Sequence, residues 1–344
     1  MFADWKKGRM NDPLGDSQEE NTAPDRGSQS LEPAPELLAS AKHPIHNLFV
    51  GPAGLRSGWR VALFVLIAAV IAFALVGATS RWHPQGAGRL WQGWLSELEL
   101  FLAVAAASLL MARIEKRPWG SYGLPARGMF GKNFWAGALW GFLWLTVMML
   151  LMRAAGVFYF GGLAIHGARI LKFAAFYGLL FLTVGFFEES LMRGYAQFTL
   201  TQGLGFWPAA ILLSALFGAL HLGNSGEAWL GILAAALIGL FLCLTLRRTG
   251  TLWFAVGFHA SWDWGESYLY SVPDSGAMVP GHLLNSSFHG PRWLTGGSVG
   301  PEGSVLVLLI IALMWVVFDR SYREAKYQVG SPIRTRSETL QPAS

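Results

Sequence analysis

The sequence predicts an all-α, polytopic membrane bundle of about eight transmembrane helices with both termini in the cytoplasm. Three observations lead to this prediction. The 344 residues are 53% hydrophobic and only 14% charged, whereas soluble proteins average about 25% charged residues. Apolar runs of roughly 15 to 25 residues recur along the chain, close to the roughly 20 residues that cross a bilayer. Basic residues are concentrated in alternate connections between these runs, as the positive-inside rule requires.

Eight apolar runs are candidates for membrane-spanning helices. They are too long and continuous for the strands of a transmembrane barrel, in which polarity alternates along the strand. Glycine and alanine on their apolar faces favour close helix packing, at Gly137, Gly141, Gly218, Ala219 and Gly231. One helical bundle is therefore the expected architecture. In chain order the runs cover approximately residues 59–78, 95–111, 134–152, 171–195, 207–222, 228–246, 252–269 and 305–318.

The distribution of Lys and Arg predicts the orientation of the bundle. With eight spans and an internal N-terminus, 20 basic residues fall in cytoplasmic segments and 6 in external ones. This is the asymmetry that membrane insertion favours, so we expect both termini in the cytoplasm. The net charge of +5 and the pI near 9.4 follow from the same asymmetry. The lipid bilayer is therefore an expected partner, and nucleic acid is not.

The polar ends of the chain are expected to flank the bundle. Residues 1–55 are rich in Pro, Ser, Glu and Gly and lack a sustained apolar period, which predicts a disordered cytoplasmic extension. Residues 56–320 should form the bundle and residues 321–344 a cytoplasmic tail, with an external loop at 271–303. The single cysteine, Cys243, lies in the sixth run, where we expect it to be a small buried residue.

Two adjacent carboxylates, Glu188 and Glu189, interrupt the fourth apolar run. A charged side chain at a bilayer centre costs about 2.5 to 3.5 kcal/mol on insertion scales, so the pair indicates a functional site. Arg193 follows Glu189 at i, i+4 and can neutralise and orient it, whereas Glu188 points about 100° away. We therefore expect Glu188 to be a general base that takes a proton from water.

Two histidines and an aspartate lie in later apolar runs at a similar depth. Counted from the glycine turn after the fourth run, Glu188 and His221 both sit roughly 24 Å inside, at about 1.5 Å per residue. His259 and Asp263 share a face of the seventh run at i, i+4. Two chemistries stay open. The possible metal ligands are Glu188, His221, His259 and Asp263: two histidines with a carboxylate would hold Zn²⁺ with an open position for water. Alternatively, Glu188 and His221 would activate water without metal while His259 and Asp263 support the oxyanion.

These residues form three motifs in order, and the motifs resemble those of a known family. They are EExxxR at Glu188, Glu189 and Arg193, FxxxH at Phe217 and His221, and HxxxD at His259 and Asp263. The chain resembles the CAAX-protease and bacteriocin-processing family of intramembrane proteases, which includes the type II prenyl-protein endopeptidases. The resemblance covers about residues 94–270, which would form the protease core.

The resemblance implies hydrolysis of a peptide bond in a membrane-associated protein or peptide. Glu188 and His221 would activate water, His259 and Asp263 would assist, and Glu189, Arg193 and Phe217 would support them, with metal-dependent and metal-free versions both open. Asp263 departs from the Asn typical of the prenyl-protein endopeptidases. It therefore favours the bacterial branch, and with it a bacterial inner membrane. An ionised Asp263 cannot donate to an oxyanion, so it suits a metal ligand or a partner that orients His259.

Other functions fit parts of the pattern. Ser225, in a Gly-Asn-Ser-Gly segment, has the form of a rhomboid-type nucleophile, although Gly and Ser are expected in any turn. The His-Glu-x-x-His and Gly-x-Gly-Asp motifs of two other intramembrane protease classes are absent from the sequence. Membrane-embedded Glu and His also suit a proton-relay transporter, but paired broken helices in two related halves are not visible. A non-catalytic scaffold or immunity protein would be expected to have lost motif residues, and none is missing.

Overall fold

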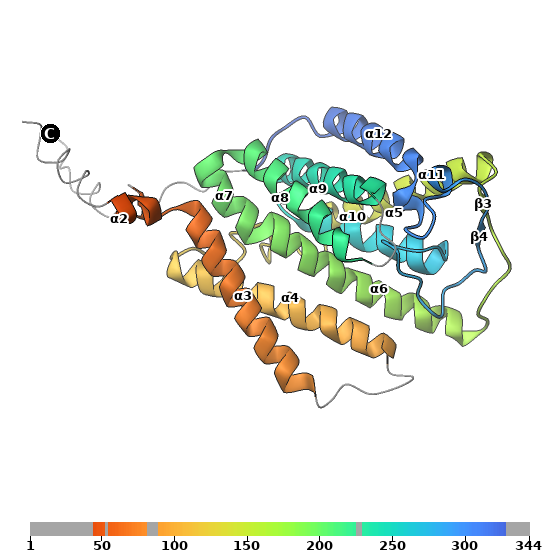
Figure 1. The fold of residues 1–344 in the computed structure, drawn as a ribbon, viewed down its shortest axis with the longest axis horizontal. Helices are drawn as coiled ribbons and strands as arrows, with labels where there is room; N and C mark the ends of the chain where they lie inside the picture. Colours follow the sequence, from red (N-terminus) through yellow and green to blue (C-terminus); the bar gives the residue numbers. More distant parts are fainter. Residues whose placement is uncertain (1–43, 52–53, 81–88, 225–228, 328–344) are drawn as a thin grey trace, which may run out of the picture. The chain divides into compact units, whose positions relative to one another are not determined.

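The computed structural model describes residues 44–51, 54–80, 89–224 and 229–327, and the predicted apolar runs form helices within them (Figure 1). The all-α, polytopic fold class is therefore confirmed. The helices that cover the eight runs are α3 (Ser57–Thr79), α4 (Arg89–Ile114), α5 (Lys132–Ala154), α6 (Ala168–Glu189), α7 (Ala196–Leu204), α8 (Phe206–Leu220), α9 (Trp229–Thr249), α10 (Trp253–Trp264) and α12 (Val305–Ser321).

Six of the helical segments in the described part of the chain are long and apolar enough to cross a membrane. The two predicted spans that are not among these six are α10 and α12, which are 12 and 17 residues long. A π-helical turn, η4 (Gly265–Leu269), extends α10, but it carries Glu266. Because α10 packs against α5, α6 and α9, protein rather than lipid surrounds most of it, and its length need not match a bilayer.

The fourth run is longer than predicted. After α6 the chain continues through the π-helical segment η2 (Ser190–Tyr195) into α7, and the whole helical stretch ends at Leu204. The expected glycine turn follows, with Gly205 at φ +85°, a conformation that suits a residue without a Cβ. Arg193 lies inside this stretch and is buried. The 20 basic residues that were assigned to cytoplasmic segments include Arg193. In the structure it belongs to the interior of the bundle instead.

Close backbone contact fixes α10 against α5. A Cβ added at Gly137 would lie 2.0 Å from the carbonyl oxygen of Phe254, and one at Gly141 would lie 2.3 Å from that of Phe258. From the other side, a Cβ at Gly257 would lie 2.1 Å from the Phe134 carbonyl oxygen. The small-residue packing expected from the sequence is therefore present at this interface.

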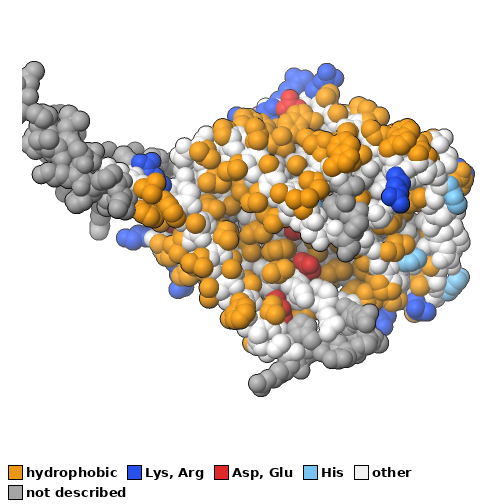
Figure 2. All heavy atoms as spheres, viewed as in Figure 1, with side chains coloured by type: hydrophobic (Ala, Val, Ile, Leu, Met, Phe, Trp, Pro, Cys, Tyr) orange, Lys and Arg blue, Asp and Glu red, His pale blue; other side chains and the backbone are white. Residues whose placement is uncertain are grey.

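Five apolar clusters of described residues pack the interior of the bundle. The largest one joins α5, α9, α10 and α12 through residues such as Leu145, Phe241, Phe258 and Met314. A second cluster joins α3 and α4 to η2. The outer surface is also apolar: Phe73 of α3 is 84% exposed, and hydrophobic side chains cover much of the face drawn in Figure 2. Apolar groups on both the inside and the outside of a bundle are expected where the solvent is lipid.

Short elements connect the helices. Residues 44–51 and 54–55, which were expected within the disordered extension, form α2 (Pro44–Phe49) and an antiparallel pair of β1 (Val50–Gly51) with β2 (Gly54–Leu55). Residues 1–43 and 328–344 lie outside the described residues. The external loop is tied down because β4 (Ser287–Phe288) pairs with β3 (Phe158–Tyr159). It also contains α11 (Arg292–Thr295) and the 3-10 turn η5 (Pro301–Gly303), and a similar turn, η3 (His221–Gly223), follows α8.

Candidate active site

The two adjacent glutamates at the end of α6 have different environments. The Glu189 side chain is 0% exposed and lies 2.9 Å from Arg193 Nη1, whereas the Glu188 side chain is 26% exposed. The i, i+4 contact expected between Glu189 and Arg193 is therefore present. The π-helical turn η2 follows directly, and it contains a non-helical residue, Gly194, with ψ −124°. Such turns are frequent at functional sites because they change the direction of side chains within a continuous helix.

Neighbouring helices make room for the buried guanidinium of Arg193. Its Cζ lies 4.5 Å from the centre of the Phe217 ring in α8, a cation–π contact. On α9, a Cβ added at Gly239 would lie 2.5 Å from Arg193 Nη2, so any larger residue there would have to displace the guanidinium. The Phe of the FxxxH motif thus covers the cation that holds Glu189.

His259 of α10 is surrounded by three carboxylates. Its Nδ1 lies 2.9 Å from Glu189 Oε1, and its Nε2 lies 3.3 Å from Glu188 Oε2 and 3.4 Å from Asp263 Oδ2. Glu189 Oε1 accepts a hydrogen bond from Arg193. Because a carboxylate oxygen is an acceptor, Nδ1–H of His259 donates to the same oxygen. Glu189 therefore orients His259, a role the sequence had suggested for Asp263, which instead lies on the Nε2 side of the ring.

His221 approaches the same space from the end of α8. Its Nδ1 lies 2.8 Å from the carbonyl oxygen of Phe217. Because a carbonyl can only accept, Nδ1 carries the proton, and in the neutral ring Nε2 keeps its lone pair. The Phe217 ring lies 4.8 Å from the imidazole, edge to face. His221 thus presents a basic nitrogen on the side away from its own helix.

One cavity brings the motif residues together. It has a volume of about 190 Å³ and is lined by side chains from α6, α8 and α10, including Glu188, His221, His259 and Asp263. A second cavity of about 180 Å³ lies between the end of α6 with η2 and the end of α8, and Glu188, Phe217 and His221 line it too. Glu188 and His221 therefore line both cavities.

Sequence reasoning missed several residues of this site. Asn224, which the sequence analysis treated only as part of a turn, lines both cavities. Its position three residues after His221 was the one sequence feature that could have placed it in the site. Asp274 and Glu302, from the external loop, line the larger cavity. The alternative nucleophile Ser225 lies outside the described residues.

The donors of the site suit a metal ion in type and orientation. Both histidines engage Nδ1 with an oxygen acceptor and leave Nε2 toward the cavity, the arrangement in which second-shell acceptors fix metal-binding imidazoles. Among the described residues, however, the ligand atoms of Glu188, His221, His259 and Asp263 are not all within 4.8 Å of one another. The same contacts equally suit water activation by Glu188 and His221 alone.

Fold and site together define a polytopic membrane protein with a polar, cavity-forming centre enclosed by its helices. Residues 170–265 match the model of the family described as Type II CAAX prenyl endopeptidase Rce1-like. This segment runs from α6 to the end of α10 and contains all three motifs, so the family resemblance is confirmed there. At the level of the family, the match supports a CAAX-type intramembrane protease. No curated protein matches the chain.

Proposed function

We propose that this protein is an intramembrane endopeptidase that hydrolyses a peptide bond of a membrane-associated protein or peptide. One observation carries the proposal: Glu188 and His221, on separate helices, face one cavity in which His259 lies 3.3 Å from Glu188. A carboxylate and a basic imidazole nitrogen in one cavity are the groups that water activation requires. The family match over these helices points to the same class of reaction.

In the proposed reaction, Glu188 takes a proton from a water held between it and Nε2 of His221. The hydroxide attacks the scissile carbonyl, and the proton passes to the leaving amine as the C–N bond breaks. His259, oriented by Glu189, faces the tetrahedral intermediate together with the amide of Asn224, which can donate to the oxyanion. A bound Zn²⁺ would be held by the two imidazoles with Asp263, which leaves a position for water, and it would lower the pKa of that water.

The test is cleavage of a library of membrane-tethered peptides by the full chain reconstituted in vesicles. Glu188→Gln should reduce the cleavage rate by at least about 100-fold, because general-base catalysis typically contributes about 10²–10⁴-fold. Glu324→Gln, at an exposed carboxylate in the C-terminal segment, is the matched control and should cleave normally. Prenylated and unprenylated peptides compared side by side would give the substrate class, and a chelator arm would separate the metal-dependent chemistry from the metal-free one.

Two outcomes would overturn the proposal. If Glu188→Gln cleaves as fast as the wild type, Glu188 is not the general base. If Ser225→Ala loses cleavage while Glu188→Gln keeps it, the reaction uses a serine nucleophile. A chain that binds these peptides without cutting any of them would instead fit a scaffold.

A further inference from the structure

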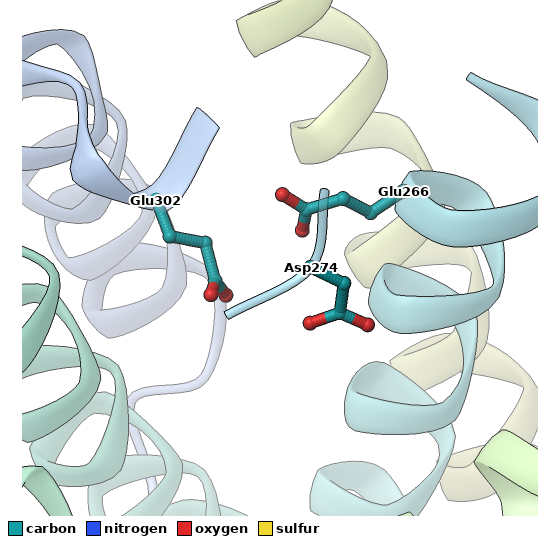
Figure 3. A group of neighbouring side chains, drawn as sticks. All are labelled: Glu266, Asp274 and Glu302. Atoms are coloured by element: carbon teal, nitrogen blue, oxygen red, sulfur yellow. The ribbon is translucent and has the colours of Figure 1, made fainter. Parts of the chain in front are cut away.

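A second group of acidic side chains lies beyond the three motifs. Glu266 comes from η4, Asp274 from the loop that follows it, and Glu302 from η5. Oxygen atoms of the three carboxylates all lie within 4.8 Å of one another, and Figure 3 shows the three side chains converging from separate segments. Among the residues that the structure describes, no lysine, arginine or histidine forms a salt bridge with any of the three.

Glu266 is the member that most requires a partner. It is 0% exposed, and neither carboxylate oxygen has a hydrogen-bond partner in the described structure. Its neighbours are satisfied by serines: Ser267 donates to Asp274 (3.1 Å) and Ser275 to Glu302 (2.8 Å). A buried carboxylate without donors is costly, so a buried, unpaired side chain directed into a carboxylate cluster indicates a missing positive ligand.

We propose that Glu266, Asp274 and Glu302 bind one divalent cation of the oxygen-preferring class, with Ca²⁺ as the best fit. The cluster offers carboxylate oxygens and no imidazole or thiolate, and such donors select hard cations over Zn²⁺. Ca²⁺ accepts an irregular set of ligands, including carbonyls and hydroxyls, at 2.3–2.6 Å, whereas Mg²⁺ needs a near-octahedral shell and usually keeps several waters. A site this buried and assembled from three segments suits the more adaptable ion.

The position of this site gives the ion a structural consequence. Asp274 and Glu302 also line the cavity that contains Glu188. One ion would therefore join the end of α10, the start of the external loop and the turn that precedes α12, and so fix one wall of the cavity. The site itself does not depend on the proposed peptidase activity, because its residues lie outside the three motifs.

The test is equilibrium dialysis of ⁴⁵Ca²⁺ against the purified, chelator-treated full chain in detergent. The wild type should bind one Ca²⁺ per chain, and its melting temperature should rise with Ca²⁺ because the ion binds only the folded state. Glu266→Gln and Glu302→Gln should each weaken binding at least 10-fold, since even second-shell changes typically cost about 10–100-fold in metal affinity. Glu302 is only partly buried, so its variant serves if Glu266→Gln does not fold.

Two control variants separate this site from the rest of the chain. Glu324→Gln, at an exposed carboxylate, should bind Ca²⁺ like the wild type. Glu188→Gln should also keep full binding, which places the ion outside the candidate active site whatever its effect on cleavage. Three results would overturn the proposal. They are a wild-type chain that does not bind one Ca²⁺, cluster variants Glu266→Gln and Glu302→Gln that both bind Ca²⁺ as tightly as the wild type, and displacement of Ca²⁺ by equimolar Zn²⁺.

Discussion

A single oxygen of Glu189 connects two of the three motifs. Oε1 accepts from Arg193 in its own helical stretch and from His259 in α10, both at 2.9 Å. Burial makes this arrangement demanding: the Glu189 and Arg193 side chains are 0% and 1% exposed. A buried ion pair adds little net stability, but removing one partner leaves an uncompensated charge in a low-dielectric interior. Glu189 is therefore a positioning residue whose loss should affect both the fold and the site.

We expect Glu189→Gln to lower the free energy of unfolding by about 3–5 kcal/mol, the usual effect of breaking a buried pair. The measurement is thermal unfolding in detergent followed by circular dichroism. The double variant Glu189→Gln/Arg193→Met should recover part of the loss, because no unpaired charge remains. A single variant that melts with the wild type would show that the ion pair does not hold these helices.

At the scale of residues, the sequence was enough to predict part of this site. Helical spacing was enough to pair Glu189 with Arg193 and to leave Glu188 free. It could not predict that His259 contacts Glu189, because that contact depends on how α10 is rotated against α6. There Gly185 of α6 lies close to α10: a Cβ added to it would lie 3.2 Å from the carbonyl oxygen of Val256 and 3.5 Å from the Cβ of His259. Asn224 was missed because nothing local marks a residue that only the tertiary fold brings to a cavity.

At the scale of elements, the glycine contacts between α5 and α10 determine where His259 lies. We expect Gly257→Ala to destabilise the protein by about 1–3 kcal/mol or more, the usual range for overpacking, because its Cβ would lie 2.1 Å from a backbone oxygen. Gly77→Ala is the matched control, with no atom within 4 Å of the added carbon. It should be neutral or stabilise by up to about 1 kcal/mol. Equal melting temperatures for the two variants would contradict this packing.

Helix positions followed from hydropathy, but helix ends and irregular turns did not. The apolar runs identified the helices because a backbone in lipid must satisfy its own hydrogen bonds. The fourth run was expected to end at residue 195, since polar residues had already appeared in it. Instead, the polar side chains of this stretch, such as Glu189, Arg193 and Gln197, are buried inside the bundle, and the helical stretch continues to Leu204. The π-helical turns η2 and η4 have no hydropathy signal, although both lie beside the polar centre.

At the scale of the whole molecule, Glu115 links three parts of the described bundle. It follows α4, and it accepts hydrogen bonds from Arg60 of α3 (3.0 Å), Tyr122 (2.8 Å) and Tyr195 of η2 (2.5 Å). Burial alone would raise the pKa of Glu115, but the hydrogen bonds and the charge of Arg60 outweigh it and hold this pKa below its ordinary value. The charged form of Glu115 therefore contributes to stability.

This lowered pKa predicts an acid-sensitive stability. The contribution of Glu115 is fully present above its unfolded pKa, near 4.3, and is lost as the pH falls through the lower folded value. At neutral pH, Glu115→Gln should lose about 1.5–3 kcal/mol, the range for hydrogen bonds to a charged group. The melting temperatures of variant and wild type should converge as the pH is lowered below about 4. A difference between them that is independent of pH would contradict the assignment.

The position of Glu188 restricts the shape of a substrate that the proposed peptidase could cut. Glu188 lines a cavity among packed helices, whereas in an intact α-helix each backbone carbonyl is hydrogen-bonded within a cylinder about 10 Å wide with its side chains. The scissile segment of a transmembrane helix would therefore have to unwind to bring its carbonyl to Glu188. Unwinding inside lipid exposes backbone groups at a cost of several kcal/mol each. A peptidase of the proposed kind would thus select substrates by how easily their helices break, which favours Gly or Pro near the cut or a cut site close to the membrane surface.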